Sequence, residues 1–285
     1  MSGAQIDGEI IALSRELNRR YGKTYYLASA LLSSRTRPYV FALYGFCRFV
    51  DDIVDVEQGS VAERLDRIDS IRDRLLAGLA QGDSDDPIVA ATIMTIRSFG
   101  IPIEYFERFF SSMRQDLVVN RYQSIDDLLV YMDGSAAVIG EMMLPLLGVS
   151  DQAARKPARA LGNAFQLTNF LRDVGEDLER DRIYLPMQDV ERFGAFEALR
   201  TRRVTDSFCD LMAFEIARNR RWYADSLTGD SYLHGRALRC VRTARRLYSA
   251  ILDEIERVGY DVFSNRATVG SAKRGKLFLQ GIITP

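Results

Sequence analysis

Lysine and histidine are scarce in this chain of 285 residues. Only four of its 38 basic residues are lysines, so arginine carries almost all of the positive charge. Arginine suits bidentate binding of phosphate groups, although genomic base composition explains the same bias more simply. The single histidine, His234, excludes a multi-histidine metal site, and nothing around it suggests a serine–histidine triad.

Cysteine is also scarce, and excess charge of one sign and long uncharged apolar runs are missing. The three cysteines lie far apart without metal or redox spacing, which predicts a reduced, cytoplasmic location. No charged-then-apolar leader begins the chain. The net charge of −1 gives no drive toward nucleic acid, so no nucleic-acid partner is expected. The most apolar window, 130–149, contains Asp133 and Glu141 and is therefore predicted to be a buried helix rather than a membrane span.

Apolar residues recur at helical spacing through most of the sequence. The few prolines and glycines fall between these periodic segments, and no stretch alternates long enough to require a sheet. No break resembles a domain linker. We therefore predict an all-α fold, with one helical domain over residues 1–285 around a common core. The predicted helices span residues 5–20, 24–33, 38–57, 60–81, 86–98, 103–121, 125–148, 151–179, 205–227, 231–258 and 271–283.

The stretch FCRFVDDIVD (46–55) places acidic residues in an apolar helix. Tyr44, Arg48, Asp51 and Asp55 follow steps of four, three and four, so they share one helical face. Apolar residues occupy the other faces. Because a buried, unpaired carboxylate is costly, this row must meet water, a cation or a metal ion.

A second stretch, NAFQLTNFLRDVGEDLERDRIYLP (163–186), repeats the arrangement. Gln166, Asn169, Asp173 and Asp177 follow steps of three, four and four on a predicted helix, and Arg172 lies beside them. Two solvated acidic faces with chance spacing would look similar. That interpretation is disfavoured because both rows have an upstream arginine and apolar flanks.

If the two rows face each other, carboxylates about 6 Å apart repel by roughly 3 kcal/mol at an effective dielectric constant near 20. Oxygen-only ligands of this kind suit Mg²⁺, which shares its coordination shell with substrate phosphates. The sequence therefore predicts a clamp that holds Mg²⁺ and a diphosphate between two helices. Ionisation of an allylic diphosphate needs such a clamp, together with an apolar cavity that shields the carbocation from water.

Four segments in order carry a family resemblance. LYGFCRFVDDIVD (43–55), RYQSIDDLLVYMDGSAAVIG (121–140), AFQLTNFLRDVGEDLERDRIYLP (164–186) and YDVFSNRATV (260–269) resemble the squalene/phytoene synthase family, and most of all its bacterial phytoene-forming members. The resemblance covers nearly the whole chain. It implies a single-domain isoprenoid-synthase-type helical bundle with a central cavity. The segment SAAVIG (135–140) departs from the family's common Val-Ala-Gly-Thr-Val-Gly, a change that could reshape the cavity wall.

The resemblance also implies roles for individual residues. The metal ligands would be Asp51, Asp55, Asp173 and Asp177 with Asn169, and Asp52 and Glu176 are secondary candidates. The diphosphate contacts would be Arg48, Arg172, Arg182, Tyr184 and Arg266. Arg48 and Tyr248 would join the four aspartates in catalysis, with Tyr248 near a diphosphate. Gln166 and Asn169 would line the reaction centre, and a kinked wall of small residues beside the prenyl chain would comprise Ala136, Val138 and Gly140.

The implied reaction is head-to-head condensation of two geranylgeranyl diphosphates through a cyclopropylcarbinyl diphosphate to phytoene, in carotenoid biosynthesis. Mg²⁺ would be the cofactor, with Mn²⁺ as an alternative, and no NADPH is expected. A C30 squalene or dehydrosqualene synthase that uses farnesyl diphosphate, a terpene cyclase and a non-catalytic assembly factor remain alternatives. Because substrate and product are lipids, we expect a cytoplasmic protein with peripheral contact on the inner face of the membrane.

Overall fold

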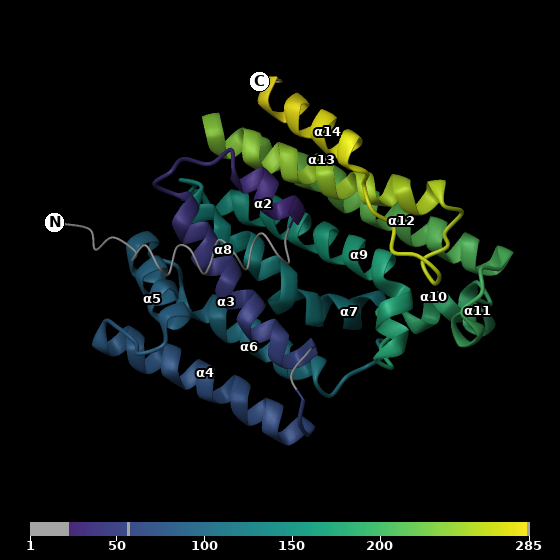
Figure 1. The fold of residues 1–285 in the computed structure, drawn as a ribbon, viewed down its shortest axis with the longest axis horizontal. Coiled ribbons are helices and arrows are strands. Elements are labelled where there is room, and N and C mark those ends of the chain that lie inside the picture. Colours follow the sequence, from purple (N-terminus) through teal and green to yellow (C-terminus); the bar gives the residue numbers. More distant parts are fainter. Residues whose placement is uncertain (1–22, 56–57, 284–285) are drawn as a thin grey trace.

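The computed structural model describes residues 23–55 and 58–283. Helices dominate this part of the chain, which contains one isolated bridge, between Arg121 and Ile183, and no β-strand (Figure 1). The all-α prediction is confirmed. The α-helices are α2 (Lys23–Ser29), α3 (Arg37–Asp55), α4 (Val61–Gln81), α5 (Pro87–Phe99), α6 (Ile103–Asp116), α7 (Ile125–Met132), α8 (Val138–Leu146), α9 (Arg155–Glu179), α10 (Met187–Arg192), α11 (Phe196–Thr201), α12 (Asp206–Ser226), α13 (Gly235–Arg257) and α14 (Ser271–Ile283). A π-helix, η1 (Asp133–Ala137), and two 3₁₀ helices, η2 (Gln152–Ala154) and η3 (Leu227–Tyr232), complete the described elements.

Capping residues explain where several helices begin and end. Ser60 and Glu63 form a reciprocal capping box at the start of α4, and Ser124 and Asp127 form one at the start of α7. Gly82 ends α4 in the left-handed conformation, which glycine adopts without steric cost. These caps lie at the predicted breaks between helices.

The predicted helix 103–121 is too long, because α6 ends at Asp116. The next residues instead pair with the segment after α9: the amide of Ile183 donates to the carbonyl of Asn120, and the amide of Met187 to that of Tyr122. A tertiary contact therefore replaces the last helical turn. The predicted helix 5–20 lies outside the described residues. The prediction of a single domain over residues 1–285 stays a prediction.

The predicted helix 125–148 is divided by η1 into α7 and α8. By length and composition alone, Ile125–Leu146 could cross a membrane, but half of its most apolar window is buried inside the protein. It packs as a core helix, as predicted. Helices α10 and α11 were not predicted, because each has six residues and shows less than two turns of periodicity.

Two apolar cores fill the bundle. One packs α3, α4, α5, α6 and α8, and the other packs α7 with α9 to α13. Helix α9 contacts α8, η1, α12 and α13, and its residue Phe165 packs against both cores. In Figure 1, α4 and α14 lie at opposite edges of the bundle and α9 runs between them. The faces of α3 and α9 that carry the acidic rows are therefore brought to the interior of the molecule.

Candidate active site

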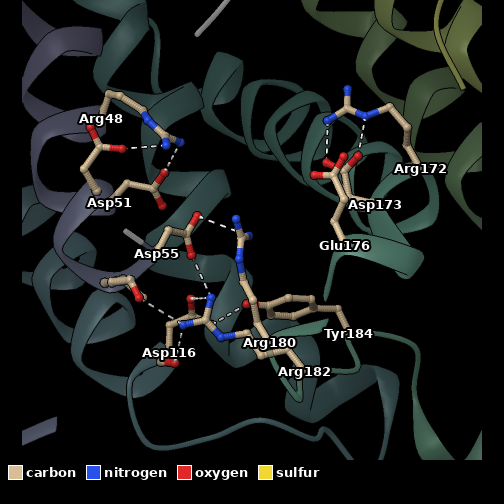
Figure 2. A network of polar contacts seen from close by, with 12 residues as sticks. Arg48, Asp51, Asp55, Asp116, Arg172, Asp173, Glu176, Arg180, Arg182 and Tyr184 are labelled. Atoms are coloured by element: carbon tan, nitrogen blue, oxygen red, sulfur yellow. Dashed lines mark hydrogen bonds and ion pairs between the residues drawn. The ribbon is translucent and has the colours of Figure 1, made fainter. Parts of the chain in front are cut away.

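The two predicted acidic rows lie on α3 and α9. Figure 2 shows Asp51 and Asp55 on one side, Asp173 and Glu176 on the other, and the side chain of Arg180 between them. The rows are electrostatically coupled, since the charge of Asp55 helps to raise the pKa of Asp177. The arrangement that the spacing predicted, two rows that face one another, is therefore present.

The row on α3 is balanced mainly by its own arginine. Arg48 forms ion pairs with Asp51 (2.6 Å) and Asp52 (2.5 Å). Burial nevertheless raises the pKa of Asp51 to about 7, and the neighbouring carboxylate of Asp55 adds to the effect. Arg48 opposes this shift without cancelling it. Burial thus favours the neutral form of the Asp51 carboxyl group, and the charge of Asp55 favours it further.

The row on α9 differs, because two guanidinium groups converge on one carboxylate. Arg172 donates two hydrogen bonds to Asp173 (2.7 and 2.6 Å), and Arg266 donates two more (2.8 and 2.9 Å). One turn further on, Asp177 is 9% exposed. Burial raises the pKa of Asp177 to about 8, and the charge of Asp173 contributes next.

Arg182 connects the α3 row to a buried acid. Its Nη1 donates to Asp55 (2.7 Å) and lies 3.7 Å from the carboxylate of Asp116. The hydroxyl of Tyr184 donates to Asp116 (2.7 Å), which is 6% exposed. Figure 2 shows this chain of contacts below Asp55. A polar pocket of about 270 Å³ adjoins it, lined by Arg64, Arg180 and Arg182 among other residues.

Divalent metal ions fit this set of donors. Within the part of the chain that the structure describes, no three acidic, thiol or imidazole groups are already arranged as metal ligands. Instead, arginine side chains form hydrogen bonds and ion pairs with carboxylates of both rows. Each row also contains one carboxyl group, that of Asp51 or Asp177, whose pKa is raised first by burial and next by a neighbouring carboxylate. A bound divalent cation would offset both effects, and ionised carboxylate oxygens suit a hard cation such as Mg²⁺.

An apolar cavity of about 270 Å³ begins where the acidic rows end. Tyr44 and Cys47 of α3 and Gln166 of α9 line it, on the same helical faces that carry Asp51 and Asp173 further along. It continues past Leu161 and Pro157 toward the start of α9, and Leu147, Tyr232 and Leu233 are among its lining residues. One surface is therefore acidic at one end and apolar at the other.

Comparison with known proteins agrees with this geometry. The family model described as squalene/phytoene synthase matches residues 18–273.

The chain belongs to the squalene/phytoene synthase family.

Among its relatives, a 15-cis-phytoene synthase from Synechocystis sp. is 37% identical over 281 residues, which cover 93% of this chain and 82% of the relative. A phytoene synthase from Arthrospira platensis is 37% identical over 276 residues, which cover 92% of this chain and 89% of the relative.

Solved structures of the squalene/phytoene synthase family share the fold. A dehydrosqualene synthase in complex with a ligand has a TM-score of 0.89 at 26% identity, covering 96% of this chain and 95% of that one. A squalene synthase from Alicyclobacillus acidocaldarius has a TM-score of 0.80 at 29% identity, covering 89% and 95%. The resemblance in the four sequence motifs is thereby confirmed.

The structure places most of the other predicted site residues of this squalene/phytoene synthase around the cavity. Ala136, Gly140, Gln166 and Tyr248 line it, and the ring of Tyr248 lies 4.4 Å from that of Phe165, centroid to centroid. Asn169 is half-buried one turn before Asp173. Burial raises the pKa of Tyr248, while the nearby charge of Arg172 lowers it.

One predicted wall residue differs from the structure. Val138 is not part of the cavity wall: its side chain is fully buried in the core that contains α3 and α6, because the π-helix turns it away from α9. Tyr184 stacks on Phe170 at 4.1 Å and donates to Asp116, so it supports Arg182. Its expected contact with a diphosphate stays a prediction.

Asp116 was missing from the predicted site. The structure buries it behind Arg182. The signal was present in α6, where Phe109, Met113 and Asp116 lie at helical spacing and all three are buried. Because Asp116 continues this buried face of the helix, its carboxyl group is not expected to face solvent.

Proposed function

We propose that this protein is a phytoene synthase, which joins two geranylgeranyl diphosphates head to head through a cyclopropylcarbinyl (prephytoene) diphosphate. Members of its family condense prenyl diphosphates, and relatives at 37% identity are named phytoene synthases. The observation that carries the proposal is the apolar cavity that runs up to two opposed acidic rows. A prenyl chain bound in such a cavity would have its diphosphate among carboxylates and arginines.

Magnesium is the metal that we propose, with Mn²⁺ as an alternative. Asp51 and Asp55 would hold it on α3, and Asp173 and Asp177 on α9 with Asn169 beside them. When bound, the ion would stabilise negative charge on the departing diphosphate. The donors are all oxygens. Burial raises the pKa values of Asp51 and Asp177, the neighbouring carboxylates of Asp55 and Asp173 add to the shift, and a bound cation would relieve both effects.

The residues of the chain account for the remaining requirements of the reaction. In the first half, the allylic C–O bond breaks, and diphosphate leaves with the electron pair. Arg48, Arg172 and Arg266 lie beside the rows and would bind its oxygens. The alkene of the second substrate then bonds to the allylic cation, and loss of a proton closes the cyclopropane ring.

In the second half, the C–O bond of the cyclopropylcarbinyl diphosphate breaks, the ring opens, and a proton is lost to give phytoene. The cation must be shielded from water throughout. The apolar lining of the cavity supplies that shield, and Phe165 and Tyr248 present aromatic rings near its acidic end. No reductant enters this scheme, so no NADPH is needed.

A C30 product is the competing possibility, because structural neighbours are named dehydrosqualene synthase and squalene synthase. One experiment separates the two. Purified protein with Mg²⁺ is given labelled farnesyl or geranylgeranyl diphosphate, with and without NADPH, and the product is identified by mass. We expect a C40 hydrocarbon from geranylgeranyl diphosphate without NADPH. A C30 product, or an absolute need for NADPH, contradicts the proposal, and the absence of any hydrocarbon supports a non-catalytic assembly factor.

We extend the proposal to the location of the protein: cytoplasmic, with peripheral contact on the inner face of the membrane. The support is chemical, since substrate and product are both lipids. Flotation of the purified protein with liposomes tests it. We expect co-flotation with vesicles, and recovery of all the protein in the unbound fraction contradicts this part of the proposal.

A further inference from the structure

The cavity wall contains an irregular helical turn. Between α7 and α8, residues Asp133–Ala137 form the π-helix η1. A π turn takes up about one residue more than an α turn, so it rotates the helix that follows by roughly 100° relative to an uninterrupted α-helix. This rotation decides which residues of α8 face the cavity and which face the core.

Two serine hydroxyl groups and close packing of α6 stabilise this turn. The carbonyl of Tyr131 accepts hydrogen bonds from the hydroxyls of Ser112 (2.7 Å) and Ser135 (3.1 Å). A Cβ atom on Gly134 would lie 2.0 Å from the carbonyl oxygen of Arg108, so α6 packs directly against the turn. Any larger residue at Gly134 would push the two backbones apart.

An ion cluster holds the turn from its outer side. Asp133, the first residue of η1, accepts two hydrogen bonds from Arg108 of α6 (both 2.7 Å) and one from Arg159 of α9 (2.6 Å). Glu141, one turn into α8, accepts from the same two arginines and from Arg155 (2.7 to 3.0 Å). Its side chain is 1% exposed. The cluster therefore joins both ends of the π turn to α6 and α9.

The inner side of the same turn is the cavity wall. Ser135 and Ala136 of η1 and Ile139, Gly140 and Met143 of α8 line the cavity. Gly140 is also pressed against α9, because an added Cβ would lie 2.3 Å from the carbonyl oxygen of Ala158. The charged residues of the cluster do not line the cavity, so any influence on a bound chain passes through the position of this wall.

We propose that the cluster of Asp133, Glu141, Arg108 and Arg159 positions the π turn and thereby sets the prenyl chain length that the cavity accepts. These are positioning residues, because they touch the wall and not the substrate. The inference rests on the proposed function, since it assumes that prenyl chains occupy the cavity. If the cluster is weakened, η1 relaxes toward α-helical geometry, α8 rotates, and larger side chains replace Gly140 at the wall.

The test measures chain-length preference rather than activity alone. Asp133→Asn keeps the size of the side chain but removes its charge. The affinities of farnesyl and geranylgeranyl thiodiphosphate, analogues that ionise slowly, are measured with Mg²⁺ by calorimetry for the wild type and the variant. We expect the ratio of the two affinities to change at least fivefold. An unchanged ratio in folded Asp133→Asn protein overturns the proposal. If that variant does not fold, the milder Arg159→Lys, which keeps the charge, is read by the same criterion.

A matched control separates positioning from general stability. Asp189→Asn weakens a second buried cluster, in which Arg218 bonds to Asp189 (2.9 Å) and Glu215 (2.6 Å) away from the cavity lining. We expect it to lower the melting temperature but to leave the ratio within twofold. An equal shift in the control overturns the proposal. If the wild type makes only a C30 product, the proposed function fails. The affinity ratio of the two thiodiphosphates in Asp133→Asn would still test the role of the cluster, so the two failures can be distinguished.

Discussion

The two acidic rows look alike in sequence but are built differently. On α3, Asp55 is held by Arg182, which is 11% exposed and anchored in turn to the buried Asp116. On α9, Asp173 is bound by its neighbour Arg172, which is 15% exposed, and is covered by the distant Arg266, which is 47% exposed. The distant arginine of the α3 row is thus tied into the core, whereas the distant arginine of the α9 row lies at the surface. The difference suggests that Arg266 can exchange its carboxylate for an incoming diphosphate more readily than Arg182 can.

The largest effect is expected from removing one carboxylate of either row. We expect Asp51→Asn and Asp173→Asn each to lower kcat by a factor on the order of 10³ or more, because charge stabilisation of the departing diphosphate is lost. Both variants should stay folded, as judged by circular dichroism. Steady-state assays of hydrocarbon formation give the measurement. Near-normal rates in either variant would contradict a metal clamp shared by the two helices.

Loss of the distant arginine should affect the stability of the protein differently in the two rows, although loss of a carboxylate affects activity in both. Arg182→Ala leaves the buried carboxylate of Asp116 uncompensated, so we expect the free energy of unfolding to fall by about 3 kcal/mol. Arg266→Ala removes a half-exposed contact and should cost less than about 1 kcal/mol. Urea denaturation of both variants provides the comparison. Equal losses would show that the two rows are anchored alike.

Much of this architecture could be predicted from the sequence. The rows themselves follow from helical spacing, since Asp51 and Asp55, like Asp173 and Asp177, lie one turn apart on a single helix. What spacing cannot show is which distant arginine reaches which acid. Arg182 reaches Asp55 and Arg266 reaches Asp173 only because the segment after α9 and the segment after α13 pack against the rows.

The cavity wall was harder to predict for a different reason. Periodicity indicated one helix over 125–148, and the family resemblance implied that Val138 belongs to the wall. A π turn changes the phase of the helix without changing its composition, so the apolar pattern of α8 does not reveal it. The cluster of Arg108, Arg159 and Asp133 that accompanies the turn joins three helices, and no local pattern links these residues.

The pH dependence of stability offers a further comparison of the rows. The folded-state pKa is about 7 for Asp51 and about 8 for Asp177, above the usual range for aspartate. A carboxyl group with a raised folded-state pKa contributes stability that is fully present below the unfolded pKa of roughly 4 and is lost as pH rises through the folded value. Without divalent ions, we expect the melting temperature to fall by a few degrees between pH 6 and pH 9.

Variants of the two aspartates and added Mg²⁺ show which group causes the pH dependence of the melting temperature. Both groups contribute to the decrease below about pH 7, whereas Asp177 alone contributes between about pH 7 and pH 8. Asp51→Asn should therefore reduce the decrease only below pH 7, and Asp177→Asn should reduce it there and abolish it above pH 7. Because a cation binds the ionised carboxylates, Mg²⁺ should raise the melting temperature more at pH 9 than at pH 6. Thermal scans with EDTA and with Mg²⁺ give the values. A pH-independent melting temperature in EDTA would show that the charges within each row are already balanced.

The smallest effect tests the second layer of contacts, which supports the α3 row through Asp116 and Tyr184. Tyr184→Phe removes the hydroxyl that donates to Asp116 at 2.7 Å, while the stacked ring on Phe170 is retained. We expect a loss of about 1 to 2 kcal/mol in the free energy of unfolding, as for a hydrogen bond to a charged group. A double-mutant cycle with Asp116→Asn isolates the pair, since the second change should cost less once the hydroxyl is gone. If the two losses simply add, the hydrogen bond between Tyr184 and Asp116 contributes no coupling energy, and Tyr184 does not support the α3 row through Asp116.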